Sequence, residues 1–119
     1  LDPQVAELIG ISLSYAENIS FYIPVGHKNI KSLNKDFVVK KLKPILEDPS
    51  IKKVGQNIKY DFIILKKYGV ELNSVEDTML LSYTLDAGNN RHNMDTLSEL
   101  HLNHKTISYK DLVGSGKKQ

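Results

Sequence analysis

The residue types best suited to chemistry lie in one short stretch of this chain, Asn57-Ile58-Lys59-Tyr60-Asp61, directly after Val54-Gly55-Gln56. The carboxamide of Asn57 and the carboxylate of Asp61 are four positions apart, a spacing that places both on one face of a helix. A single carboxylate can hold one divalent cation, but it cannot support metal-assisted chemistry alone. The function therefore depends on acidic partners for Asp61, and the sequence shows none at a suitable spacing.

Composition limits what else could form a site. The chain has 119 residues, 40% hydrophobic and 25% charged, as is typical of one ordinary globular domain. It contains no Cys, so disulfides and thiolate metal sites are excluded and a metal must be held by oxygen or His. The His residues do not have the spacing of a metal site: they are His27, His92, His101 and His104. We expect His101 and His104 to be surface residues at the end of a helix.

The charge pattern is mildly basic, with a net charge of +2. The lysine pairs are expected to be mostly solvated, with at most a weak attraction to DNA. No apolar run approaches the roughly 18 residues that a membrane span requires. The sequence therefore predicts no membrane association, and a reducing cytoplasm is the expected location.

The first half of the chain predicts a hairpin followed by two helices. Residues 8–16 and 20–25 alternate between apolar and polar side chains around Glu17-Asn18, which indicates an antiparallel hairpin. A helix over residues 36–47 is expected, capped by Asn34 or Ser32 and kinked or split at Pro44. Its predicted buried stripe is Val38, Leu42, Ile45 and Leu46. A short strand over 52–55 then leads to a helix that starts near Asn57 and stops at Gly69.

The second half predicts one strand and three helices. Residues 70–75 could form a short strand, and Asp77 could cap a mostly buried helix that ends near Leu85. A helix over 94–102 with Met94, Leu97 and Leu100 inward follows, and Ser108 could cap a last piece over 109–113. The predicted order ββαβαβααα is that of a mixed α/β domain.

The stretch that contains Asn57 and Asp61 resembles the second exonuclease motif of the 3′→5′ proofreading domain of bacterial DNA polymerase I. Residues 22–25 and 42–48 upstream fit the same pattern, as do residues 77–80, 91–95, 102–107 and 114–119 downstream. The resemblance thus covers nearly the whole chain in order, and it also indicates that the terminal Gly-Ser-Gly stretch is native sequence.

The resemblance implies a ribonuclease-H-like fold, in which a mixed sheet is flanked by helices. It also implies hydrolysis by two Mg²⁺ or Mn²⁺ ions, about 3.5–4 Å apart, held by four carboxylates. Asp61 matches one of these and is the predicted catalytic and metal-binding residue. The family's Asp-x-Glu pair on the first strand and its Tyr-x-x-x-Asp pair in a late helix have no match here, because Tyr60 and Asp61 are adjacent and Tyr109 and Asp111 have the wrong spacing.

Residues 1–119 are therefore expected to be a partial domain that lacks the first central strand and the last helical motif. Loss of a central strand would expose strand edges on both sides. We expect this chain to be inactive by itself. We also expect it to be unstable alone, to be completed by pairing with another chain, a second copy included, or to be a piece of a longer protein.

The resemblance also implies contacts with a single-stranded or frayed 3′ end of DNA. The residues concerned are Gln56, Asn57, Tyr60, Arg91, Tyr109 and Leu1. Four of them have a plainer interpretation: Asn57 as a helix N-cap, Arg91 as a surface residue, and Tyr60 and Tyr109 as part of the packing.

Three functions remain open at this point. The first is a proofreading exonuclease domain that works beside the polymerase domain of the same parent chain. The second is a structural or nucleic-acid-binding module that keeps the exonuclease fold without its activity. The third is a relative that trims RNA. The intact Asp61 favours a catalytic function over the second.

Overall fold

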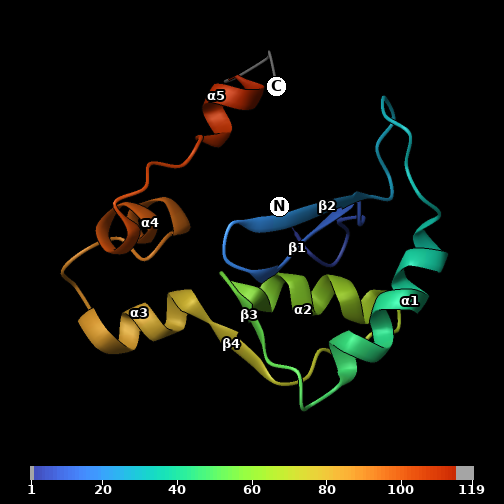
Figure 1. Ribbon diagram of the computed structural model, residues 1–119, viewed down its shortest axis with the longest axis horizontal. Coiled ribbons are helices and arrows are strands. Elements are labelled where there is room, and N and C mark those ends of the chain that lie inside the picture. Colours follow the sequence, from blue (N-terminus) through green and yellow to red (C-terminus); the bar gives the residue numbers. More distant parts are fainter. Residues whose placement is uncertain (1, 115–119) are drawn as a thin grey trace. The chain divides into compact units, whose positions relative to one another are not determined.

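The computed structural model describes residues 2–114. They divide into two compact units, Leu1–Glu76 and Asp77–Gln119. The elements follow one another in the order β1 β2 α1 β3 α2 β4 α3 α4 α5 (Figure 1). This is the predicted order, so the mixed α/β class is confirmed.

The first unit begins with a hairpin of β1 (Gly10–Ala16) and β2 (Ile19–Pro24). The two strands are antiparallel, with Ile11 opposite Ile23 and Gly10 opposite Pro24. Asn18 lies in the tight connection at φ 57°, a left-handed conformation that Asn tolerates better than most residues. The predicted hairpin is therefore confirmed.

The helix α1 (Lys35–Glu47) is capped by Asn34, whose side chain accepts a hydrogen bond of 2.9 Å from the backbone N–H of Phe37. The helix is not divided at Pro44, so of the two outcomes predicted there the split is wrong, and the kink stays a prediction. Ile45 was predicted to be buried but is 50% exposed, and Val39 is buried instead. The buried stripe is thus rotated toward Val39, which leaves Ile45 at its solvent edge.

The strand β3 (Lys53–Gly55) leads directly into α2 (Ile58–Lys67), as predicted. The end of α2 is a Schellman motif: Val70 N–H donates to the Leu65 carbonyl (3.1 Å), and Gly69 N–H donates to the Lys66 carbonyl (3.1 Å). Gly69 has the positive φ, +77°, that this motif requires.

The predicted strand over residues 70–75 is wrong, because β4 (Val75–Asp77) begins only at Val75. The N–H of Val70 is used by the helix end, and Asn73 N–H donates to the Leu46 carbonyl (3.1 Å). Those backbone groups are therefore not available for a strand ladder. The strands form two separate pairs, β1–β2 and β3–β4.

The hydrophobic core of the described residues lies entirely in the first unit. Ile11 and Ile23 of the hairpin pack against it. Its buried members are aliphatic: Leu8, Val25, Val38, Val39, Leu46, Leu65, Val70 and Leu72.

The second unit consists of three helices, α3 (Thr78–Asp86), α4 (Met94–Leu102) and α5 (Tyr109–Val113). Side chains of the preceding residues cap all three, as predicted for Asp77 and Ser108; Asn93 caps α4. The expectation that α3 is mostly buried is wrong, because no residue of α3 is buried.

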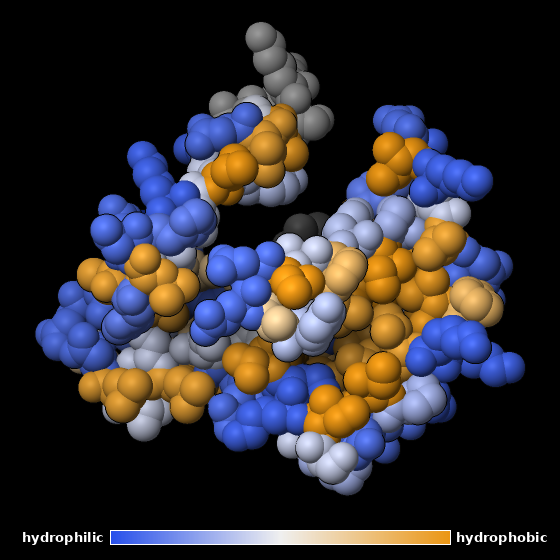
Figure 2. Space-filling model, viewed as in Figure 1, coloured by the Kyte–Doolittle hydropathy of each residue, from blue (hydrophilic) through white to orange (hydrophobic). Residues whose placement is uncertain are grey.

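Exposed apolar side chains are numerous in this unit. Leu80 and Leu85 of α3 are 61% and 86% exposed, and the band of apolar residues at the lower left of Figure 2 lies over this helix. In α4, Met94 and Leu100 are exposed, against the expectation that they point inward. The buried residues of this unit are polar: Asp77, His92 and Ser98.

Within residues 2–114, no helix has the length and apolar character needed to cross a membrane.

The helix end at Gly69 makes a testable prediction. A Cβ at Gly69 would meet no atom within 4 Å, so a substitution there changes only the cost of the positive φ. Gly69→Ala is expected to lower the free energy of unfolding by about 1 kcal/mol. Gly69→Asn, the matched control, should lower it less, because Asn enters this conformation more easily. Urea denaturation followed by circular dichroism measures both, and an equal loss in the two variants would contradict backbone strain as the cause.

Candidate functional site

A channel of about 670 Å³ lies within the first unit. Residues 6–13 line one side, β3 lines another, and the start of α2 contributes Ile58, Tyr60 and Asp61. We call this the β1–β3 channel. Tyr60 and Asp61, two of the predicted site residues, are thus brought together with the edges of two strands.

The start of α2 places Asp61 at the channel. Gly55 allows the tight passage from β3 into the helix, because a Cβ there would come within 2.8 Å of the Ile58 side chain. Asp61 is exposed and lies in the first turn of α2. Negative charge is favourable there, since the unpaired N–H groups at a helix start carry partial positive charge.

Asn57 occupies the N-cap position of α2 in a left-handed conformation, with φ 52° and ψ 44°. N-cap residues that bond the helix through their side chains normally have extended backbone. Accordingly, the Asn57 side chain makes no capping hydrogen bond to the helix. Asn57 therefore occupies the predicted N-cap position, but its side chain does not cap the helix. Its neighbour Gln56 is half-buried.

The remaining predicted site residues lie elsewhere. Arg91 is exposed and belongs to the second unit. Tyr109, also in the second unit, is the first residue of α5 and is 69% exposed, so its interpretation as a packing residue is not supported. Leu1 lies outside the described residues.

The contacts of His92 could not be predicted from the sequence. His92 is 6% exposed, its Nδ1 lies 2.7 Å from the Ser82 hydroxyl, and its ring lies 3.8 Å from that of Tyr83. These contacts are those of a packed structural residue. His101 and His104 are exposed, as predicted.

Residues 2–114 do not provide a complete set of donors for a two-metal centre. Residues 2–114 contain no group of three or more His, Cys, Asp or Glu side chains placed to hold a metal ion. Asp61 supplies a suitable hard oxygen ligand. One carboxylate is not enough to fix two ions, so the residues present do not fit the expected metal pair.

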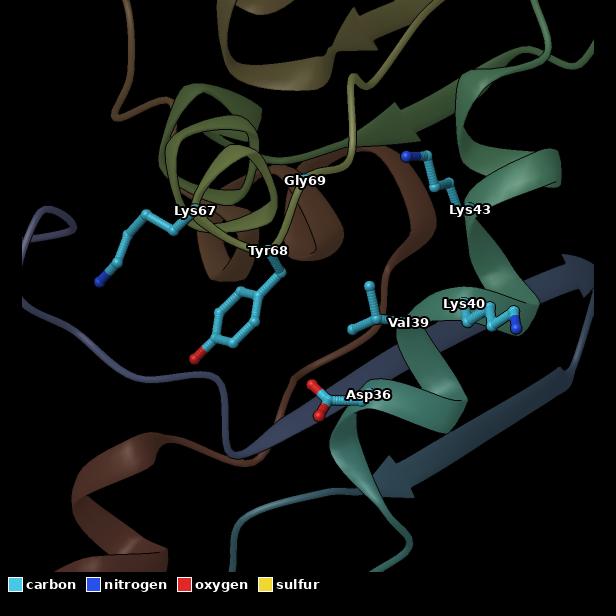
Figure 3. A pocket seen from close by; sticks show the side chains of 7 residues that line it. All are labelled: Asp36, Val39, Lys40, Lys43, Lys67, Tyr68 and Gly69. Carbon is cyan, nitrogen blue, oxygen red and sulfur yellow. The ribbon is translucent and has the colours of Figure 1, made fainter.

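A second, shallower pocket of about 450 Å³ lies between α1 and the end of α2 (Figure 3). Its lysines do not converge on it. Lys67 and Lys40 point away from each other in Figure 3. Lys67 donates to the Ala6 carbonyl (2.7 Å), and Lys43 lies 3.8 Å from Glu47. This pocket has no set of groups for anion binding or chemistry.

Lys53 holds β3 against the end of α1. Its ammonium donates to the backbone carbonyls of Asp48 (2.7 Å) and Ile45 (3.4 Å). A cation at a helix C-terminus is stabilising because the carbonyls there carry partial negative charge. Hydrogen bonds from the Ser50 hydroxyl and N–H, with a smaller contribution from Lys53, hold the pKa of Asp48 below its usual range.

Comparison with solved structures identifies the class of fold. The chain is similar to a structure described as the apo form of a nuclease, with a TM-score of 0.72 and 19% identity over 92% of this chain and 50% of that one. At that identity the likeness concerns the fold, and it confirms the predicted ribonuclease-H-like α/β class.

Comparison with sequence families identifies the family. A family model described as 3′-5′ exonuclease matches residues 1–119, and the chain belongs to this family. It is 44% identical to DNA polymerase I of Rhizobium leguminosarum, over 98% of this chain and 14% of that protein. It is 41% identical to DNA polymerase I of Pseudomonas aeruginosa, over 100% of this chain and 14% of that protein. The chain thus spans about one seventh of the length of these relatives.

The adjacent residues Lys52 and Lys53 allow a matched test of what holds β3 in place at the β1–β3 channel. Lys53→Met should lower the free energy of unfolding by about 1 kcal/mol, because it removes bonds to two carbonyls of the α1 end. Lys52 forms an exposed ion pair with Glu76 (2.6 Å), so Lys52→Met should cost no more than about 0.5 kcal/mol. Urea denaturation compares the two. A larger effect at Lys52 would mean that the α1 contact does not hold β3.

Proposed function

We propose that this chain is the exonuclease portion of a DNA polymerase I and that, in the complete protein, it removes mismatched nucleotides from the 3′ end of a DNA strand. The observation that carries the proposal is the family match over the whole chain, together with Asp61 at the β1–β3 channel. The polymerase domain of the same polypeptide would be its working partner, and access to replicating DNA requires a cytoplasmic location.

Asp61 is the proposed metal ligand and catalytic residue. Mg²⁺ and Mn²⁺ prefer oxygen ligands, and the Asp61 carboxylate is accessible to solvent at the channel. Because residues 2–114 contain no group of three or more potential metal ligands, we propose that further ligands come from elsewhere in the complete protein. This chain alone is accordingly proposed to be inactive.

We propose contacts with nucleic acid in each unit, and each unit is considered by itself. Gln56, Asn57 and Tyr60 flank the carboxylate along the start of α2, and we propose that they orient the terminal nucleotide. Arg91 is proposed to contact a phosphate and Tyr109 to stack on a base. Stacking suits a frayed end of any sequence, because every base offers an aromatic face. For Leu1 a contact with the terminal base stays a prediction.

The absence of a metal-ligand group among residues 2–114 also favours one rival, an exonuclease-like module without activity. Degradation of DNA and RNA oligonucleotides by the complete protein separates the possibilities. Faster loss of nucleotides from DNA supports the proposal, faster loss from RNA indicates an RNA-trimming relative, and no loss from either indicates the inactive module.

In the complete protein, Asp61→Ala is expected to lower 3′→5′ exonuclease activity by roughly a thousandfold, because a metal ligand is lost. Polymerase activity should be unchanged. Lys66→Ala, at the exposed far end of α2, is the control and should leave both activities as they are. A primer labelled at its 5′ end reports both activities, and an equal loss of both in Asp61→Ala would contradict a local role.

Tyr109→Ala is expected to raise the KM for single-stranded DNA several-fold while lowering kcat less, since a base–aromatic stack is worth about 1–3 kcal/mol. Tyr109→Phe keeps the ring and should behave like the parent protein. An unchanged KM in Tyr109→Ala would remove Tyr109 from the binding site.

A further inference from the structure

The junction between β3 and α2 contains a close contact between Gly55 and Ile58. A Cβ added at Gly55 would lie 2.8 Å from Cδ1, 3.1 Å from Cγ1 and 3.3 Å from Cβ of Ile58. Carbon atoms attract each other best at about 3.5–4.0 Å, so all three contacts would be too short. Gly55 is not one of the glycines with a positive φ, so the contact, and not the backbone conformation, requires glycine here.

The conformation of Asn57 brings Ile58 to this position. Asn57 has φ 52° and ψ 44°, so the chain makes a left-handed turn between the end of β3 and the first residue of α2. Its carbonyl accepts a hydrogen bond from Tyr60 N–H (3.1 Å), which closes the first turn of the helix directly after it. The helix therefore begins with the Ile58 side chain lying against Gly55.

The Ile58 side chain has little freedom to move away from Gly55. It packs against the hydrophobic core. An isoleucine in a helix has one strongly preferred χ1 rotamer, so Cγ1 follows the backbone and only Cδ1 can turn aside. At Gly10, by contrast, an added Cβ would meet the outer end of the Tyr22 ring, which is 51% exposed and can swing outward. A side chain at position 55 would therefore displace the backbone of α2.

Such a displacement would reach Asp61. Ile58 and Asp61 belong to the same first turn of α2, and the buried side chain of Leu65 fixes the helix further along. A shift of Ile58 by roughly a few tenths of an ångström would relieve the contact with an added Cβ. Because the turn between them is closed by hydrogen bonds, the Asp61 carboxylate would be carried along with Ile58.

We propose that Gly55 is a positioning residue for Asp61. By carrying no side chain, Gly55 lets Ile58 rest against the end of β3, and this contact sets where the Asp61 carboxylate stands at the β1–β3 channel. Gly55 acts through Ile58 and the helix backbone. The consequence for catalysis rests on the proposed function, in which Asp61 takes part in the cleavage of DNA.

The first test is the Gly55→Ala variant of the complete protein, assayed on single-stranded DNA labelled at its 5′ end. A misplacement of about 1 Å can cost a hundredfold in rate, so a shift of a few tenths of an ångström should lower kcat roughly fivefold. The KM should change less than about twofold, because the groups that bind DNA remain. Polymerase activity should be unchanged.

Gly69→Ala is the matched control for a general disturbance of α2. It alters the other end of the same helix, where an added Cβ meets no atom within 4 Å. It is expected to cost stability without moving Asp61, so its kcat should equal that of the parent protein. An equal loss of kcat in Gly69→Ala would mean that lowered stability, and not the position of Asp61, explains the effect.

Removal of the Ile58 side chain should cancel the effect of Gly55→Ala. Ile58→Ala deletes Cδ1 and Cγ1 and leaves the Cβ contact of 3.3 Å. Since Ile58→Ala also removes packing against the core, the effect of Gly55→Ala is measured in both backgrounds. In the Ile58→Ala background it should be less than about twofold. An effect of the same size in both backgrounds would overturn the proposal, because it would not act through Ile58.

Crystal structures of the same variants separate this proposal from the proposed function. Relative to the core, Gly55→Ala should shift the Asp61 Cα by roughly a few tenths of an ångström, and the double variant should restore its position. If this shift is seen but the parent protein has no nuclease activity, the proposed function is wrong and the positioning of Asp61 by Gly55 stands. If Asp61 does not shift, or if it shifts in an active protein without a change in kcat, Gly55 is not a positioning residue.

Discussion

The packing of eight aliphatic side chains is the contact on which the rest of the first unit depends. Val38, Val39 and Leu46 come from α1, and Leu65 comes from α2. This core fixes both helices and the hairpin, yet it leaves β1 and β3 in separate sheets. A strand edge carries backbone groups that need hydrogen-bond partners, and water supplies them only where the edge stays open. The channel is therefore a consequence of a core that is closed on one side and open on the other.

The same core explains why Asp61 is well placed although it is exposed. The far end of α2 is anchored by buried Leu65 and by the Schellman motif at Gly69 and Val70. At its near end, β3 is tied to α1 through Lys53. The carboxylate is thus held on a helix that is fixed at both ends. The precise placement that the proposed role of Asp61 requires depends on such rigid support.

Local features of this fold could be predicted well from the sequence. The hairpin, the caps at Asn34, Asp77 and Ser108, and the stop at Gly69 depend on residues within a few positions of one another. Predictions that depend on distant partners were poorer. Ile45 and several residues of α3 are apolar, but whether an apolar side chain is buried depends on what packs against it. The strand expected over 70–75 failed because the end of α2 uses the Val70 N–H.

The sequence by itself determined the order of the elements, the family, and Asp61 as the acidic side chain that could serve in catalysis. Each of these follows from patterns and motifs among residues that are close together in the sequence. Only the tertiary structure decided that Asp61 and Tyr60 face a channel between two strand edges, and that the Ile58 side chain lies against Gly55. The position of Ile58 follows from its packing against the core. Such packing is a relation between segments that are distant in the sequence, and no short motif specifies it.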